Sequence, residues 1–144
     1  MATMTYSTEF DAQPETVFQV MDDIEQAKKW LGGLIEIELL TDGGNRVGAR
    51  TRHVYDENGR HIEMIEETLV YDPNRRIKIE GKNEMMYLTA EYTLIPVDNK
   101  TRVDYSSTMR LRGWMRIFSP ILMRMSCKKV EQDFERLKTL VESA

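Results

Sequence analysis

The sequence predicts an α+β fold in which a long C-terminal helix covers one face of a seven-stranded antiparallel sheet. The first observation is a stripe of apolar residues in residues 119–144, whose spacings of four and three mark one face of an α-helix. The second is a series of alternating segments between residues 34 and 112, joined by hairpin-length turns. A long amphipathic helix that follows such a series needs the sheet as the partner for its apolar face.

The first part of the chain predicts one strand and two short helices. Residues 3–10 alternate in polarity and are rich in Thr and Tyr, which is typical of a strand. Pro14 is expected at the first position of a helix, where a backbone N–H would have no partner anyway. A second short helix should end at Gly32-Gly33, with Trp30 near its end.

Six further strands are expected, each bounded by a turn that contains Gly, Pro, Asp or Asn. They span residues 34–41, 46–55, 61–71, 75–81, 85–95 and 101–112. A short turn of helix or loop should follow, and the long helix should begin with Ser119 as its N-cap and Pro120 at its first helical position. No linker or repeat interrupts these elements, so residues 1–144 are expected to form a single domain.

Composition and charge limit the classes of function. The chain has 144 residues, a net charge of -4 and one cysteine, Cys127, so no disulfide can form within the chain. It shows no secretory signal at its start and no apolar run long enough for a membrane span, so we expect a cytoplasmic protein. The negative net charge argues against nucleic acid as a partner. The oligomeric state is left open.

Five motifs carry a resemblance to a known family. They are residues 12–18 (AQPETVF), Trp30, residues 47–50 (VGAR), residues 72–76 (DPNRR) and residues 134–138 (FERLK). With this order of elements, the chain resembles the START-like superfamily, also called SRPBCC or Bet v 1-like, and within it the bacterial polyketide cyclase/dehydrase and lipid-transport group. The resemblance implies the helix-grip fold, in which a curved sheet grips the long helix and an apolar cavity lies between them.

The resemblance, together with the alternation of the strands, implies a ligand in that cavity. A mostly apolar pocket with a few polar groups suits a small hydrophobic or amphipathic molecule, such as a lipid or an aromatic or polyketide-like compound. The side chains expected to contact it are Trp30, Thr51, His53, Met64, Met86, Tyr92, Tyr105, Ser107, Met109, Phe118, Met123, Cys127 and Val130. Binding or transport of this ligand, rather than turnover, is the leading interpretation.

Two residues are candidates for acid–base catalysis. His53 shares a strand face with Thr51, and the neighbouring Arg50 and Arg52 point the other way, so His53 faces the cavity if the arginines face water. Glu66 lies on a strand whose two faces are equally apolar, so the direction of its side chain stays open. The alternative function is therefore a cyclase/dehydrase-type enzyme, although a shortage of paired acid–base groups in the cavity argues against it. No metal or nucleotide motif is present, so neither metal nor cofactor is expected.

Residues 110–129 form a basic-aromatic band that suggests a third function. The band contains six Lys or Arg residues, and no acidic residue occurs between Asp104 and Glu131. Aromatic residues interleaved with arginines resemble a peripheral membrane contact or a protein-docking surface, here carried by Trp114, Arg116, Phe118 and Arg124. In the opposing interpretation, the two aromatic side chains fold inward and close the mouth of the cavity.

Overall fold

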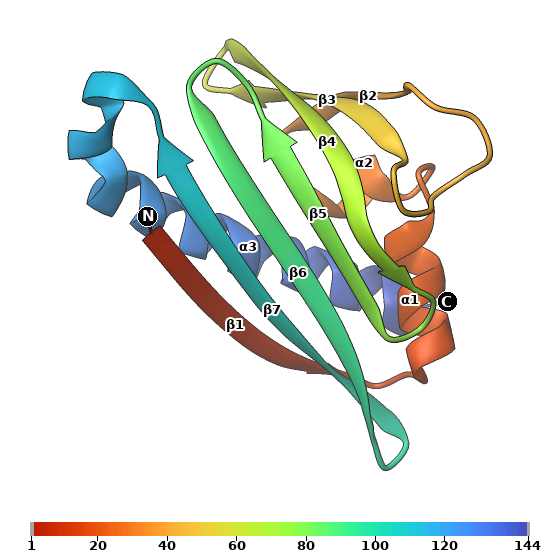
Figure 1. The fold of residues 1–144 in the computed structure, drawn as a ribbon. Coiled ribbons are helices and arrows are strands. Elements are labelled where there is room, and N and C mark those ends of the chain that lie inside the picture. The colour runs from red at the N-terminus through yellow and green to blue at the C-terminus, as the bar shows by residue number, and fades with distance from the viewer. Residues whose placement is uncertain (1, 144) are drawn as a thin grey trace.

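The computed structural model describes residues 2–143, which form one antiparallel sheet and the helices that cover one of its faces (Figure 1). In chain order the elements are β1 (Ala2–Phe10), α1 (Pro14–Asp22), α2 (Ala27–Trp30), β2 (Leu34–Leu39), β3 (Arg50–Glu57), β4 (Arg60–Asp72), β5 (Arg76–Lys82), β6 (Met86–Val97), β7 (Lys100–Leu111), the 3-10 helix η1 (Gly113–Phe118) and α3 (Ser119–Glu142). This order confirms the α+β helix-grip fold that the sequence predicts.

The seven strands lie in the order β1-β7-β6-β5-β4-β3-β2, and every neighbouring pair is antiparallel. Strands β2 to β7 follow one another as antiparallel neighbours, and turns of two or three residues join all of them except β2 and β3, which residues 40–49 connect. Strand β1 pairs with β7 at the opposite edge from β2, so α1 and α2 carry the chain from one edge of the sheet to the other. Helix α3 then crosses the same face diagonally (Figure 1).

Three predicted boundaries are wrong, each for a local physical reason. Strand β3 begins at Arg50 instead of residue 46, because Gly48 has a φ of 89° and its N–H donates to the carbonyl of Thr68. Gly81, which the sequence places where a turn begins, lies within β5 and pairs with Leu88. Ser119 is the first residue of α3 and not its N-cap, because η1 already turns the backbone helically and leaves Phe118 at the cap position.

The core is centred on the C-terminal half of α3. Phe134, Leu137 and Val141 are fully buried at helical spacing, as the apolar stripe predicts. The ring of Phe134 is surrounded by four aromatic rings from the sheet, whose centroids lie 5.3 to 6.4 Å away. These rings belong to Tyr6, Phe10, Tyr92 and Tyr105. All the fully buried residues of α3 lie at or beyond position 133, so its N-terminal half is held less closely.

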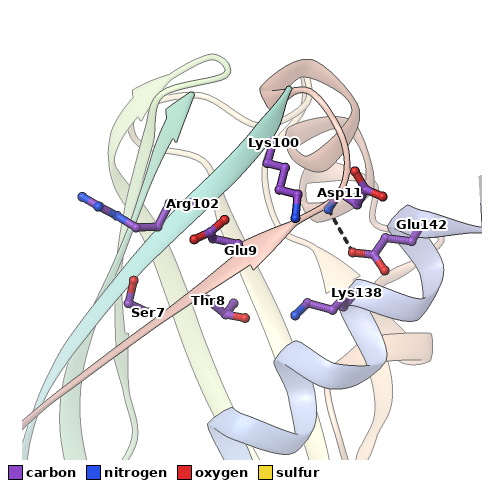
Figure 2. A pocket seen from close by; sticks show the side chains of 8 residues that line it. All are labelled: Ser7, Thr8, Glu9, Asp11, Lys100, Arg102, Lys138 and Glu142. Atoms are coloured by element: carbon purple, nitrogen blue, oxygen red, sulfur yellow. Dashed lines mark hydrogen bonds between the residues drawn. The ribbon is translucent and has the colours of Figure 1, made fainter. Parts of the chain in front are cut away.

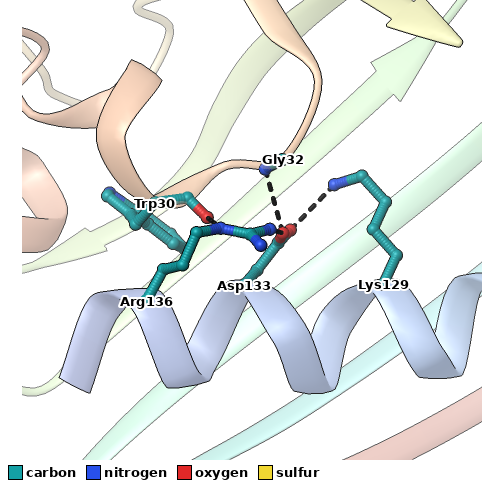
Figure 3. A network of polar contacts seen from close by, with 5 residues as sticks. All are labelled: Trp30, Gly32, Lys129, Asp133 and Arg136. Atoms are coloured by element: carbon teal, nitrogen blue, oxygen red, sulfur yellow. Dashed lines mark hydrogen bonds and ion pairs between the residues drawn. The ribbon is translucent and has the colours of Figure 1, made fainter. Parts of the chain in front are cut away.

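A buried carboxylate ties α3 to the turn between α2 and β2 (Figure 3). Asp133 is only 5% exposed, and its Oδ1 accepts a 2.9 Å hydrogen bond from the backbone N–H of Gly32. The ammonium of Lys129 lies 2.8 Å from Oδ2, and the guanidinium of Arg136 donates to Oδ1. Arg136 also donates through Nε to the carbonyl oxygen of Trp30 at 3.1 Å. A buried charge with this many partners is stabilised, whereas the same charge without them would be costly.

We expect Asp133→Ala to lower the free energy of unfolding by about 2 kcal/mol, because the N–H of Gly32 loses its acceptor and two cations lose their counter-ion. The cations are partly exposed and can be rehydrated, which keeps the loss below that of a fully buried pair. Urea denaturation measures the change. Glu131→Ala, at an exposed site on the same helix, is the control and should stay within about 0.5 kcal/mol of the wild type. Equal midpoints for the two variants would contradict this role for Asp133.

Candidate functional site

The candidate site lies on the helix-facing side of the sheet, opposite the N-terminal half of α3. In the β3–β4 ladder, Thr51 pairs with Glu66 and His53 pairs with Met64, so these four side chains share one face. His53 and Met64 are buried, which identifies this face as the inner one. Arg52 points to the other face and forms ion pairs there with acidic residues of β2 and β4. The direction of Glu66, which the sequence left open, is therefore inward.

His53 and Glu66 form a titratable pair inside the protein. Nδ1 of His53 lies 3.5 Å from Oε2 of Glu66 and 3.3 Å from Oγ1 of Thr51. Burial lowers the pKa of His53 to about 4, so the imidazole is neutral at pH 7. Burial also raises the pKa of Glu66 to about 7, against the opposing effect of the Lys129 ammonium. At neutral pH the carboxylate is therefore close to the midpoint of its titration.

Three tyrosines bring hydroxyl groups to the same face. Burial raises the pKa of Tyr55, Tyr92 and Tyr105 above its ordinary value, so all three hydroxyls stay protonated and can donate hydrogen bonds. The rings of Tyr92 and Tyr105 meet edge to face, with centroids 5.0 Å apart. Within residues 2–143 the hydroxyls of Tyr55 and Tyr92 have no hydrogen-bond partner. Both residues are half-buried, so their hydroxyls are free to bond to a water or to a polar group of a ligand.

Helix α3 supplies the opposite side of the site. Met123, Cys127 and Val130 are half-buried and pack against the core, as their spacing predicts. The thiol of Cys127 lies 3.7 Å from the sulfur of Met4 on β1. The ammonium of Lys129 lies 5.3 Å from the centre of the Tyr55 ring, a distance at which the cation is attracted to the ring face. Apart from Lys129, the site is thus apolar on the helix side, and it is mainly polar on the sheet side.

Gly81 is a site residue that the sequence reasoning missed. A Cβ atom at this position would lie 3.1 Å from Cε of Met64, 3.3 Å from Cδ1 of Leu88 and 3.5 Å from Cγ of Glu66. The absence of a side chain on β5 therefore lets Met64 and Glu66 lie close to the sheet instead of projecting into the site. Gly81 was missed because a glycine at the end of a predicted strand indicates a turn. Tyr55 was missed although it alternates in phase with His53, which was the available signal.

Most of the predicted ligand-contacting residues are brought to one face, and two are not. Met86, Ser107 and Met109 lie on inward-facing positions of β6 and β7 beside the tyrosines. Trp30 instead belongs to the core, where its buried Nε1 has no hydrogen-bond partner within residues 2–143. Phe118 lies on the surface, with its ring packed edge to face on Trp114 at 5.8 Å. It projects outward because η1 carries it past the end of the sheet.

One recess on the outer surface, of about 600 Å³, lies between the C-terminal end of α3 and the strands β1 and β7 (Figure 2). Its charged residues are Glu9, Asp11, Glu142, Lys100, Arg102 and Lys138. Acidic and basic groups are equal in number, and Glu142 is already bonded to the backbone N–H of Asp11 at 2.9 Å, so no charged ligand is favoured. Within residues 2–143, no three His, Cys, Asp or Glu residues are grouped as a metal site would require.

Comparisons with known proteins agree with this geometry. A START superfamily protein from Mycobacterium smegmatis has a TM-score of 0.82 at 14% identity, over 98% of this chain and 97% of that one. TTHA0849 from Thermus thermophilus has a TM-score of 0.83 at 20% identity, over 99% and 98% of the two chains. Ara h 8.0201 has a TM-score of 0.77 at 16% identity, over 99% and 100%. These likenesses confirm the predicted fold.

The search of curated proteins found no match. A sequence profile of one family, described as polyketide cyclase / dehydrase and lipid transport, matches residues 1–142. The match spans every strand and helix that the structure describes, from β1 to α3. The chain therefore belongs to the polyketide cyclase / dehydrase and lipid transport family.

Proposed function

We propose that this protein binds a small hydrophobic or amphipathic molecule between the sheet and the N-terminal half of α3. The observation that carries the proposal is that the half-buried hydroxyls of Tyr55 and Tyr92 lie on the sheet face that α3 covers and have no protein partner within residues 2–143. The residues of α3 that pack towards this face, Met123, Cys127 and Val130, are apolar. The family's description, which covers polyketides and lipids, supports a ligand of this class. Apolar burial would supply most of the affinity, at about 25 cal/mol per Å².

The charge of the site favours an uncharged polar group on the ligand. Glu66 is a desolvated carboxyl group with a pKa of about 7, so it gains a negative charge as the pH rises through neutrality. A fatty-acid carboxylate would be repelled by that charge, whereas a phenol, quinone or ketone can accept hydrogen bonds from Tyr55 and Tyr92 without it. Quinone-like and aromatic polyketide-like compounds are therefore the proposed ligand class.

A panel of neutral and acidic ligands tests this proposal. Neutral aromatic ketones or quinones should raise the melting temperature of the delipidated protein. At a ligand concentration of 100 times the Kd, binding stabilises the native state by about 2.7 kcal/mol. Fatty acids should have a smaller effect at pH 8 than at pH 5. Gly81→Val should reduce the shift, because the new side chain pushes Met64 into the site, while Lys82→Ala on the outer face of β5 should not. An unchanged melting temperature with every ligand class would rule the proposal out.

The pH dependence of stability tests the enclosure of Glu66. Its pKa of about 7 lies above the ordinary value of 4.5, so ionisation favours the unfolded chain and wild-type stability falls as the pH rises through this interval. Glu66→Gln removes this dependence. The free energy of unfolding of the variant minus that of the wild type should therefore increase by about 2 kcal/mol from about pH 5 to about pH 8, as measured by urea denaturation. Glu67→Gln, on the outer face of β4, is the control and should show no such gain. An equal gain in both variants would contradict the assignment.

A second function is favoured by the His53–Glu66 pair, which supplies the acid and base that a dehydrase needs. Neutral His53 can accept the proton next to a ketone, and the electron pair of the broken C–H bond then forms a C=C bond. A hydroxyl on the next carbon leaves as water with the proton of Glu66. The proton on His53 then returns to Glu66 across the 3.5 Å separation, which resets the pair.

If the protein is a dehydrase of this kind, His53→Ala should lower turnover of a β-hydroxy ketone by about 100-fold or more. His61→Ala, at an exposed position of β4, should keep the wild-type rate. Formation of the conjugated ketone can be followed by its ultraviolet absorption. A His53→Ala variant with full turnover would exclude this mechanism and leave binding as the function.

A further inference from the structure

A row of exposed apolar side chains runs along η1 and the first turns of α3. It comprises Trp114, Ile117, Phe118, Ile121 and Met125, and we call it the apolar ridge. Trp114 is 73% exposed and Phe118 is 38% exposed, so these two aromatic side chains do not fold inward, contrary to one interpretation of the sequence. Trp114, Ile117, Ile121 and Met125 follow one another at spacings of three and four along a nearly continuous helical path, which places them on one side, and Phe118 adjoins Ile117. Exposed apolar surface of this extent indicates a contact with a partner.

A basic recess adjoins the apolar ridge. This arginine recess has a volume of about 480 Å³ and is lined by Tyr87, Arg110, Leu111, Arg112, Gly113 and Arg116. It lies where β7 leaves the sheet and η1 begins, so Arg116 belongs both to the recess and to the helix that carries the ridge. Within residues 2–143 none of its three arginines forms a salt bridge. Their guanidinium groups are therefore available to an external anion.

The charge distribution identifies the kind of partner. The chain has a net charge of -4, yet residues 105–130 carry six positive and no negative charges. The rest of the chain is therefore strongly acidic, at about -10 by subtraction, and would be repelled by an anionic surface. Only the end that carries the ridge and the recess can approach such a surface. An anionic bilayer offers the matching layers, with phosphates for the arginines and an apolar boundary for the ridge.

We propose that the apolar ridge and the arginine recess dock this protein on the surface of an anionic phospholipid bilayer. The ridge lies in the interfacial region, with Trp114 at headgroup depth, and the arginines bind lipid phosphates. Within residues 2–143 no helix is long and apolar enough to span a membrane. The opposite side of the same helical turns carries Met123 and Cys127, which face the interior site. If the proposed function holds, cargo would therefore enter the protein at its docked end.

Vesicle flotation tests the docking without any cargo. The wild type should bind vesicles of phosphatidylcholine mixed with phosphatidylglycerol, and binding should weaken with added salt. Trp114→Ala combined with Ile117→Ala should weaken it about 10-fold or more. Arg112→Gln combined with Arg116→Gln should weaken it about 10-fold on the mixed vesicles, with little effect on phosphatidylcholine alone. Leu39→Ala and Arg60→Gln, at exposed positions of β2 and β4, are matched controls that should bind as the wild type does.

Tryptophan fluorescence supplies a second readout on the unmodified protein. Trp30 is buried and Trp114 is exposed, so insertion should shift only the Trp114 emission to shorter wavelength and make it quenchable by brominated lipid. The proposal is overturned if the wild type does not bind the mixed vesicles, or if the ridge and recess variants bind them as tightly as the wild type does. It is also overturned if the wild type forms a dimer that Trp114→Ala separates, because a second copy then covers the ridge. The melting-temperature test with the ligand panel, repeated on the Trp114→Ala variant, shows whether ligand binding at the interior site is independent of membrane docking.

Discussion

The packing of Phe134 against four aromatic rings of the sheet fixes where the long helix lies. These rings come from β1, β6 and β7, so one side chain of α3 is held by strands from the edge to the middle of the sheet. Leu137 and Val141 extend the contact towards the C-terminus, and Asp133 adds a polar attachment to the turn before β2. All of these contacts are in the second half of α3. The first half is positioned by them but contains no buried residue of its own.

The structural network and the candidate site share one residue, Lys129. Its ammonium forms an ion pair with Asp133 at 2.8 Å and also lies over the ring of Tyr55. The same positive charge opposes the rise in the pKa of Glu66 that burial causes. The attachment of α3 to the α2–β2 turn therefore also sets the electrostatic environment of the site. A change in the position of α3 would therefore alter the proton affinity of Glu66 through Lys129.

The fold could be predicted from the sequence because it depends on local periodicity, whereas the site depends on contacts between distant strands. The stripe of α3 and the alternation of β7 are properties of consecutive residues, and both predictions are confirmed. Glu66 could not be assigned to a face because both faces of its strand are apolar, and only the pairing with Thr51 on β3 settles the choice. Gly81 was missed because a glycine near a turn and a glycine within a strand look alike in sequence. Phe118 was misplaced because its direction depends on where η1 leaves the sheet.

The interior site and the docking surface have a common physical origin. An amphipathic helix normally presents one apolar face to the core and a polar face to water. The first half of α3 departs from this pattern, since Met123 and Cys127 face the interior while Ile121 and Met125 face outward. Its inner side is only half-buried against the core, and its outer side leaves Ile121 and Met125 exposed to water. A helix end with two apolar sides is what the two proposals together require, since one side would face a hydrophobic cargo and the other a bilayer, with the arginines beside it for the lipid phosphates.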